Sequence, residues 1–471
     1  MSRDVKENGE HVTMTPQSLP HTTPDGITPS DALTTTDATA PAAPPHGEDA
    51  APPVPSIGDG QAPAAILWRP VVAQAGLMWL VTRLVYVIFT YFAVVTRYQE
   101  AALRKVQFTR LGPGVFVASW GQGDAAWFLN IARLGYSTPQ DAPFFPLYPA
   151  LVKLVALLLG SQYVAAGLIV ANLGTLGAFV ALGLLVAHES GAMSPLGGAR
   201  ALLAFVAFPL AFVLVAPYSD GVALAFIFAA LLCARRGAWR WAALWAALAG
   251  LTQPIAIILV APLLWELARQ HGGFTPLVAQ LRVALPGQIA SSDGDRDAQR
   301  SSVTEASITN STAIRYGALA VVAAPLGMAL YMVFLLFHFG DPVLFLTASP
   351  VPHQPSGFLA PADSFLQARA LADLALVVIA AGLTLAMTRR APVTLTLYLL
   401  GLLLLCLSTG VLTGSDPTLT AGRYLLAAAP LFLLLGHWME RRPWLDLLVI
   451  FGGFAFQAIF AMIFLWGGWL A

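Results

Sequence analysis

Apolar runs of bilayer-crossing length recur from Pro70 almost to the C-terminus, and they constrain the fold more than any other feature. A helix needs about 20 residues to cross a hydrocarbon core of ~30 Å. The sequence lacks the alternating ten-residue pattern of membrane β-strands, so helices are the expected spanning elements. We therefore predict an all-α polytopic membrane protein. The runs lie near 70–97, 163–187, 199–216, 219–235, 239–266, 314–338, 367–388, 392–414, 422–437 and 444–469.

Composition excludes several other classes of protein. Hydrophobic residues make up 57% of the chain and charged residues 11%, whereas soluble domains carry about 25% charged residues. The 25 basic and 25 acidic side chains balance, so no basic excess points to nucleic acid. The two cysteines, Cys233 and Cys406, lie inside apolar stretches and predict neither a disulfide framework nor a zinc cluster. The preference for arginine and alanine is typical of a GC-rich bacterial genome, and we expect a multi-pass protein of a bacterial plasma membrane.

The N-terminal segment differs from the rest of the chain. Residues 1–66 are rich in proline, threonine and acidic side chains and show no apolar periodicity. Such a segment buries too little apolar surface to offset the entropy of ordering it. We predict a disordered cytoplasmic tail over 1–66 and a single membrane domain over 67–471.

Arginine pairs in short loops predict the orientation. Arg235-Arg236, Arg389-Arg390 and Arg441-Arg442 should face the cytoplasm. Counting crossings from these pairs makes 98–162 one long external loop and 267–313 a polar cytoplasmic insert.

This count holds on two conditions. Segment 144–160, interrupted by two prolines, must lie along the outer interface without crossing. Segment 239–266 must break at Gln253-Pro254 into two arms that return inside. Counting both arms, we predict about eleven membrane helices, with interfacial helices in the first external loop.

The external loop contains the most distinctive polar residue of the chain. On a helix beginning near Asp124, the side chains of Trp127, Phe128, Ile131 and Leu134 share one face. We expect this face to lie in the headgroup layer. Asp124 itself could be the helix N-cap, or it could be a catalytic carboxylate held where a lipid-linked substrate meets water.

Motifs along the chain resemble those of one family. The sequences DAAWFLNIARLGY over 124–136 and FFPLYP over 144–149 are similar to the signature of the PIG-V mannosyltransferases, whose eukaryotic members add the second mannose to GPI precursors. Gly123 and Ala125 stand where the family often has Trp and Gly, and Gln253 replaces a usual Arg. Later segments resemble family motifs in the same order: APYSD at 216–220, RRG at 235–237, LTQP at 251–254, FGDP at 339–342 and RYLL at 423–426.

The resemblance implies a GT-C-like bundle and a glycosyltransferase of cell envelope glycan biosynthesis. Enzymes of this class use a polyprenyl-phosphate sugar donor and a catalytic carboxylate in the first external loop. Asp124 would be the base of a single inverting displacement that moves a mannosyl residue to a glycolipid or glycan hydroxyl on the external face. A double displacement would need a second carboxylate about 5 Å away, for which Asp220 and Asp141 are candidates. No cofactor is required, although a divalent cation stays open.

Other candidate site residues have two interpretations each. Arg423 could grip the leaving phosphate in a fork or anchor its helix at the interface. Arg83 lies mid-helix, where a charge costs about 2.5–3.5 kcal/mol on insertion scales, so it needs a partner, either substrate phosphate or, as we favour, a structural carboxylate. Asp220 could cap its helix or contact sugar hydroxyls, and Tyr218 and Tyr424 accompany the motifs as substrate contacts.

Four more residues of the outer segments complete the list. Trp127 is a candidate substrate contact, and Tyr148 could pack in the core or line a groove for the polyprenyl chain. Asp341 could open a turn or bind acceptor. His338 shares its loop with a second histidine at 353, and no spacing there predicts a metal triad.

Two alternatives stay open. A transporter or flippase of a lipid-linked sugar would show inverted repeats with interrupted helices in both halves, whereas the sequence offers one interrupted segment, at Gln253-Pro254. A related enzyme could also use a sugar other than mannose, because sugar choice depends on hydroxyl contacts. A membrane scaffold without catalysis would leave the external Asp, Tyr and Arg residues unexplained.

Overall fold

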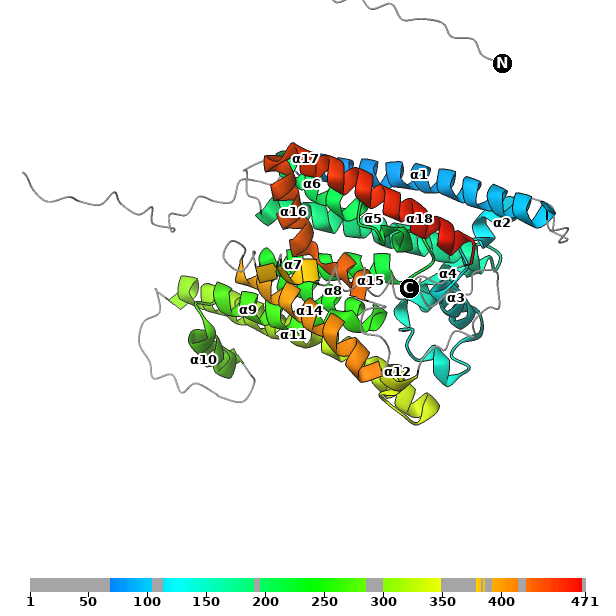
Figure 1. The fold of residues 1–471 in the computed structure, drawn as a ribbon. Helices are drawn as coiled ribbons and strands as arrows, with labels where there is room; N and C mark the ends of the chain where they lie inside the picture. Colours follow the sequence, from blue (N-terminus) through cyan, green and yellow to red (C-terminus); the bar gives the residue numbers. More distant parts are fainter. Residues whose placement is uncertain are drawn as a thin grey trace, which may run out of the picture. The chain divides into compact units, whose positions relative to one another are not determined.

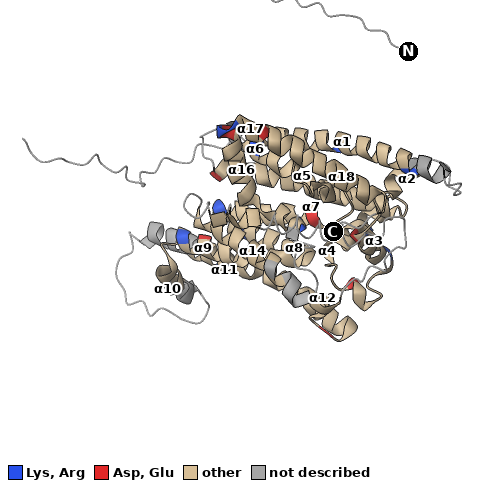
Figure 2. Ribbon diagram, viewed as in Figure 1, with Lys and Arg blue, Asp and Glu red and all other residues tan. Residues whose placement is uncertain are grey.

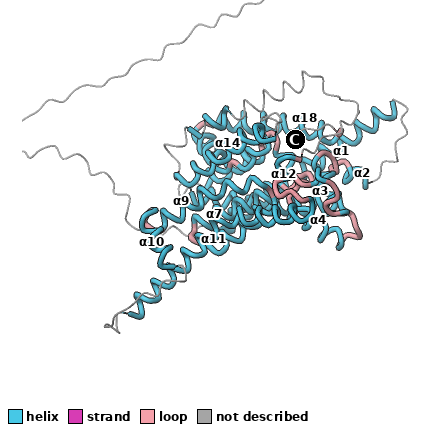
Figure 3. Tube along the Cα trace, turned by 90° about the horizontal axis from the view of Figure 1, so that it is seen from below, coloured by secondary structure: helices cyan, strands magenta, loops and turns pink. Residues whose placement is uncertain are grey.

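The computed structural model describes residues 68–103, 113–189, 195–284, 300–348, 378–382, 384–385, 392–413 and 421–467. These residues form helices joined by loops, with no strand among them (Figure 3), which confirms the predicted all-α class for the described chain. They all belong to one compact unit, Gln61–Ala471. The predicted tail over 1–66, most of the run 367–388, and residues 285–299 of the predicted insert lie outside the described residues.

Figure 1 labels the described α-helices in the order of the chain. They are α1 (Trp68–Leu103), α2 (Pro113–Ala118), α3 (Asp124–Leu134), α4 (Leu147–Leu158), α5 (Tyr163–Glu189), α6 (Pro195–Val206), α7 (Asp220–Arg235), α8 (Trp239–Thr252), α9 (Val260–Gln270), α10 (Phe274–Ala284), α11 (Arg300–Phe339), α12 (Leu344–Thr347), α14 (Val393–Thr413), α15 (Ala421–Tyr424), α16 (Ala429–Arg441), α17 (Pro443–Leu447) and α18 (Gly453–Leu465). Short 3-10 and π turns join several of them: η1 (Pro139–Asp141), η3 (Ala211–Leu214), η4 (Pro254–Leu259), η5 (Leu425–Ala427) and η6 (Leu448–Gly452).

Four described helices are long and apolar enough to cross a membrane: Trp68–Arg97, Tyr163–Glu189, Ser311–Phe339 and Pro443–Leu465. Large apolar side chains on these helices are exposed, among them Leu84 and Val87 on α1 and Leu330 and Phe337 on α11. Exposed leucines and phenylalanines along a long helix are expected where lipid is the solvent. The chain is therefore a helical membrane protein, and the count of about eleven membrane helices stays a prediction.

Successive long helices pack side by side. α1 packs on α5, α5 on α7, α7 on α8 and α8 on α11, while α18 lies against α1 and α16 against α6 (Figure 1). Glycine allows the closest of these contacts. A Cβ added to Gly250 of α8 would come within 2.2 Å of the Ala324 carbonyl oxygen of α11, and one added to Gly327 within 2.5 Å of the Ala247 carbonyl oxygen. Small residues at helix crossings are the usual means of close packing in membranes.

The prediction of one helix over 199–216 is wrong. α6 ends at Val206, and the chain from 207 to 219 is irregular and almost entirely buried before α7 begins at Asp220. Buried irregular backbone must find partners for its polar groups. Side chains of distant helices supply them: the Gln457 amide donates to the carbonyls of Val206 and Phe208. We call residues 207–219 the buried connection.

The predicted break at Gln253-Pro254 is confirmed. α8 ends at Thr252, Gln253 is extended with φ −155° and ψ 147°, and α9 follows after η4. Proline disfavours the helical conformation of the residue before it, which explains the break. The two arms return to one end of the bundle, because the Trp239 Nε1 at the start of α8 donates to the Gln270 Oε1 at the end of α9 over 3.1 Å.

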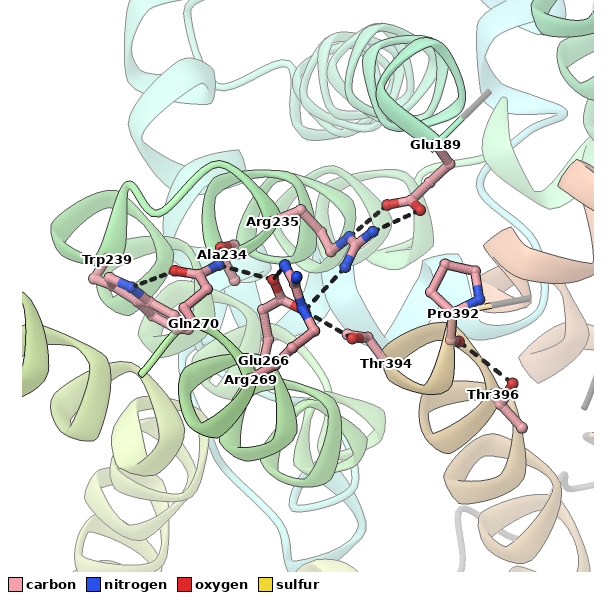
Figure 4. A network of polar contacts seen from close by, with 10 residues as sticks. All are labelled: Glu189, Ala234, Arg235, Trp239, Glu266, Arg269, Gln270, Pro392, Thr394 and Thr396. Carbon is pink, nitrogen blue, oxygen red and sulfur yellow. Dashed lines mark hydrogen bonds and ion pairs between the residues drawn. The ribbon is translucent and has the colours of Figure 1, made fainter. Parts of the chain in front are cut away.

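A cluster of charged side chains around one buried carboxylate joins four helices at that end. Glu266 of α9 is completely buried. It accepts hydrogen bonds from Arg269 of its own helix, from Arg235 of α7 (3.0 Å) and from Thr394 of α14 (2.8 Å), as Figure 4 shows. Arg235 also grips Glu189 of α5 with its Nε and Nη2. We call these five residues the Glu266 cluster.

Arginine and exposed tryptophan also gather at this end. Arg236, Arg240 and Trp241 are exposed beside the Glu266 cluster, and most basic segments of Figure 2 lie around α9 and α17. Arginines in short loops next to tryptophan are typical of the cytoplasmic boundary of a membrane protein.

Candidate functional site

Asp124 is the first residue of α3, and its carboxylate contacts an arginine 299 residues away. Gly123, at φ 59°, precedes the helix as its N-cap, so the interpretation of Asp124 as the cap is wrong. Instead the Oδ2 of Asp124 accepts a hydrogen bond from the Arg423 Nη1 at 2.5 Å. The glycine conformation turns the chain into α3 and directs the first side chain toward α15, which carries the arginine.

Asp220 holds the other side of the same guanidinium. The Nε of Arg423 donates to both carboxylate oxygens of Asp220, at 3.0 and 3.1 Å, and the Nη2 lies 2.8 Å from Oδ2. Asp220 is the first residue of α7, and Ser219 occupies the N-cap position. The cap interpretation of Asp220 is therefore wrong as well. Arg423 bridges the starts of two helices that are far apart in sequence.

Gln253 completes the cluster, a contact that sequence reasoning missed. Its Nε2 donates to the Ser219 Oγ at 2.9 Å and to the Asp220 Oδ1 at 3.3 Å. The signal was available, because Gln253 stands at the break before Pro254, where an extended residue exposes its side chain to neighbouring helices. Gln253 and Arg423 thus both donate to the Oδ1 of Asp220.

Tyr218 lies beneath the arginine. The Cζ of Arg423 stands 4.8 Å from the centre of the Tyr218 ring, a cation–π distance. The Tyr218 hydroxyl accepts a hydrogen bond from the Asp124 backbone N–H at 3.2 Å. Tyr424 follows Arg423, is partly buried and packs against the core. We call Asp124, Asp220, Arg423, Tyr218 and Gln253 the carboxylate–arginine cluster.

The cluster contains two carboxylates and one guanidinium. Burial raises the pKa of the Asp124 carboxyl above its ordinary value; the Arg423 charge and its hydrogen bond act in the opposite direction, and the Asp220 charge adds to the rise. The Asp124 side chain keeps 16% of its surface exposed and that of Arg423 keeps 13%. Both groups are therefore partly exposed.

The aromatic stripe of α3 packs inward and does not face a headgroup layer. Phe128 and Ile131 are buried, and Trp127 stacks on Phe144 with ring centres 5.7 Å apart. Leu134 is the exposed member of the set. The expectation that this face lies in the headgroup layer is wrong for the buried residues, because the segment after η1 folds back over them.

Tyr148 is completely buried, and its hydroxyl donates to the Gly167 carbonyl of α5 at 3.0 Å. Core packing therefore describes its place, and it offers no surface to a groove. The exposed face of α4 is formed by leucines instead, with Leu154, Leu157 and Leu158 at least 60% exposed.

Arg83 finds structural partners, but they are not the carboxylate that we expected. Its guanidinium lies 5.3 Å from the Trp79 ring centre, and its Nη2 is 3.5 Å from the Leu214 carbonyl oxygen of the buried connection. The Nη1 donates to the Thr82 hydroxyl at 3.2 Å. No described carboxylate contacts it. The side chain thus lies beside the buried connection, at Leu214.

The remaining candidates lie apart from the cluster. Asp341 Oδ1 accepts from the Val343 N–H at 2.9 Å, which is the turn interpretation. Asp141 accepts from the N–H groups of Ser137 and Thr138, each at 2.8 Å, so of the two expected second carboxylates only Asp220 adjoins Asp124.

The histidine loop shows no metal site within the described chain. His338 Nε2 lies 2.9 Å from the Tyr136 carbonyl oxygen, and residue 353 falls outside the described residues. Searching the described side chains finds no group of three or more His, Cys, Asp or Glu residues able to hold a metal ion.

Comparison with known proteins adds no family to this geometry: the sequence matches no family model, no curated protein and no solved structure.

Proposed function

We propose that the protein is a membrane glycosyltransferase that moves a mannosyl residue from a polyprenyl-phosphate donor to an acceptor hydroxyl on the external face of the plasma membrane. The observation that carries this proposal is the carboxylate–arginine cluster, in which Asp124 and Asp220 share Arg423. A carboxylate can accept a hydroxyl proton, and a guanidinium can bind phosphate. Their direct contact brings both functions to one point.

The two ends of α7 support the external location. Asp220 begins the helix and Arg235 ends it, and the 16 residues of the helix span about 24 Å. The arginine end has the composition of a cytoplasmic boundary, so the Asp220 end belongs near the opposite surface. A donor whose lipid tail lies in the outer leaflet would present its phosphate at that height.

α4 supports the same arrangement. Its 12 residues extend about 18 Å, too short to cross the hydrocarbon core. One face packs on α5 while Leu154, Leu157 and Leu158 stay exposed. A short helix with one leucine face is suited to lie in the interface, as expected for segment 144–160.

In the proposed reaction Asp124 takes the proton of the acceptor hydroxyl. The hydroxyl oxygen attacks C1 of the sugar from the face opposite the phosphate, the new C–O bond forms, and the bond from C1 to the phosphate oxygen breaks. The released polyprenyl phosphate carries the electron pair and its negative charge. One displacement inverts the anomeric centre, so a β-linked donor yields an α-linked product.

Arg423 would bind the departing phosphate without leaving its place. Asp220 holds the guanidinium through both Nε and Nη2, whereas Asp124 contacts Nη1 alone. An incoming phosphate can therefore take over the Nη1 side while Asp220, supported by Gln253, keeps the arginine anchored. The exchange would leave Asp124 free to act as the base.

Replacing Asp124 by Asn tests the proposal. Membranes containing the wild-type or Asp124→Asn protein are supplied with polyprenyl-phosphate mannose radiolabelled in the sugar. The lipid and glycan products are separated and counted. General-base catalysis contributes about 10²–10⁴-fold, so we expect transfer by the variant to fall by at least that lower factor.

The matched control is Asp446→Asn, because Asp446 also pairs with an arginine, Arg200 at 3.2 Å, at the other end of the bundle. Its transfer should equal that of the wild type. Near-normal transfer by Asp124→Asn would remove the base assignment, and movement of intact labelled donor across the membrane without transfer would favour a flippase. Glycan analysis of a deletion strain would identify the acceptor.

A further inference from the structure

Thr175 of α5 contacts the chain on both sides of the Tyr218-Ser219-Asp220 segment, at Leu214 before it and at Gly221 directly after it. We infer that Thr175 is a positioning residue, which fixes where this segment presents Asp220 and Tyr218 to Arg423. The inference rests on the proposed function, since it assigns a supporting residue to the same site.

The first contact lies on the N-terminal side of the segment. The Thr175 hydroxyl is 2.7 Å from the Leu214 carbonyl oxygen, at the end of η3, and 2.9 Å from the Ala171 carbonyl oxygen of its own helix. Leu214 is the last residue of η3 within the buried connection, where buried carbonyl groups need hydrogen-bond partners. The hydroxyl thus ties irregular backbone to a long, regular helix.

The second contact lies on the C-terminal side of the segment. A Cβ added to Gly221 would come within 2.3 Å of the Thr175 Oγ1 and 2.8 Å of the Ala171 carbonyl oxygen. Gly221 follows Asp220 directly, so α7 begins in van der Waals contact with Thr175. The eight residues from Leu214 to Gly221 therefore start and finish against one side chain.

Neighbouring residues of α5 extend the same support. The Asn172 Nδ2 donates to the Val215 carbonyl oxygen at 3.2 Å. A Cβ at Gly167 would come within 2.8 Å of the Pro217 side chain, and one at Gly174 within 2.5 Å of that of Val222. The segment therefore packs against residues 167–175 of α5.

Burial separates this role from substrate contact. Thr175 is 0% exposed, so a substrate cannot reach it. Its hydroxyl acts through Asp220, which in turn anchors Arg423. Misplacing a reacting group by 1 Å can cost about 10²-fold in rate, so a small shift of the segment should slow the chemical step more than it weakens donor binding.

Two substitutions test the role on purified protein in detergent. Thr175→Val keeps the shape and removes the hydroxyl, whereas Thr175→Ser keeps the hydroxyl. We expect Thr175→Val to lower kcat at least tenfold per folded molecule, with the KM for polyprenyl-phosphate mannose changed less than threefold. Thr175→Ser should restore kcat to within threefold of the wild type.

Thr384→Val is the matched control. Thr384 is also buried, and its hydroxyl donates to the Ala380 carbonyl one turn earlier. This variant should keep the wild-type kcat. If Thr175→Val does not fold, Thr175→Ala removes the hydroxyl without adding a methyl group in its place, and the same tenfold decrease is expected.

A wild-type kcat in folded Thr175→Val or Thr175→Ala would overturn the inference, as would a kcat in Thr175→Ser as low as that of Thr175→Val. Failure of the proposed function looks different. In that case the wild type transfers no mannose, or Asp124→Asn transfers it normally, whatever the Thr175 variants do.

Discussion

The proton affinity of one carboxyl group gives the sharpest residue-scale prediction. Burial raises the pKa of Asp124, with Arg423 opposing the rise. A base must be unprotonated, so activity is present above this pKa and disappears as the pH falls through it. Because the pKa lies above the ordinary value of an aspartate, about 3.9, the acid limb of kcat/KM should appear at a higher pH than for an exposed aspartate.

The same reasoning predicts the direction in which the pKa of Asp124 changes in a variant. Removing the guanidinium in Arg423→Gln removes the group that lowers the pKa of Asp124. The acid limb of any residual activity should therefore lie at a still higher pH. The measurement is the pH profile of transfer between pH 4 and 8 for both proteins. A wild-type rate that stays constant down to pH 4, or a limb that moves to lower pH in Arg423→Gln, contradicts the assignment of Asp124 as base.

Individual site residues were predictable from the sequence, but their contacts were not. Asp220, Tyr218 and Arg423 stand out as polar residues at the ends of apolar runs, and Asp124 as a carboxylate before an aromatic stripe in the long loop. Nothing in the periodicity of a run tells which helix starts meet, because one contact joins residues 299 positions apart. Gln253 went unnoticed as a partner: its place before Pro254 indicates an extended residue, but does not tell which side chains it meets.

At the scale of elements, the Glu266 cluster gives a prediction about stability. Glu266→Gln leaves Arg235 and Arg269 without their shared carboxylate, and breaking a buried ion pair costs about 3–5 kcal/mol. We expect a clear decrease of the melting temperature in detergent, measured by size-exclusion of heated samples. Transfer per folded molecule should not change, because the cluster lies at the end of the bundle away from Asp220.

The control for this prediction is Asp446→Asn. Its ion pair with Arg200 is partly exposed, at 24% and 25%, whereas Glu266 is completely buried, and the loss of a partly exposed pair costs less than the loss of a buried one. Its melting temperature should lie close to that of the wild type. Equal melting temperatures for Glu266→Gln and Asp446→Asn would show that the buried cluster contributes no more than a partly exposed pair.

Breaks in elements were predictable where proline acts locally, and not where distant side chains compensate. The break after Thr252 follows from Gln253-Pro254 alone. The buried connection does not, because 199–216 has the apolar composition of a spanning helix. Its carbonyl groups find Gln457, Asn172 and Thr175, on helices at other places in the chain. A single run of sequence cannot reveal such partners.

At the scale of the whole molecule, run length fixed the class and left the assembly open. The apolar composition requires lipid as the solvent for most of the chain. Because the sequence lacks the alternating pattern of membrane β-strands, the spanning elements are helices. The order in which helices pack, α1 on α5 on α7 on α8 on α11, depends on glycine contacts such as Gly250 against Ala324. The starts of α3 and α7 meet at Arg423 of α15, and so the site is a property of the assembled bundle.

Sidedness is the prediction that the whole molecule makes. The native cysteines Cys233 and Cys406 are replaced by alanine, and one cysteine is introduced as Gln140→Cys or Arg236→Cys. Both positions are exposed, the first in η1 near α3 and the second at the arginine end. A maleimide that does not cross membranes should label Gln140→Cys in intact cells and Arg236→Cys only after the cells are broken. The reverse pattern would place Asp124 beside the cytoplasm, where a donor in the outer leaflet cannot reach it, and the proposed reaction would lose its substrate.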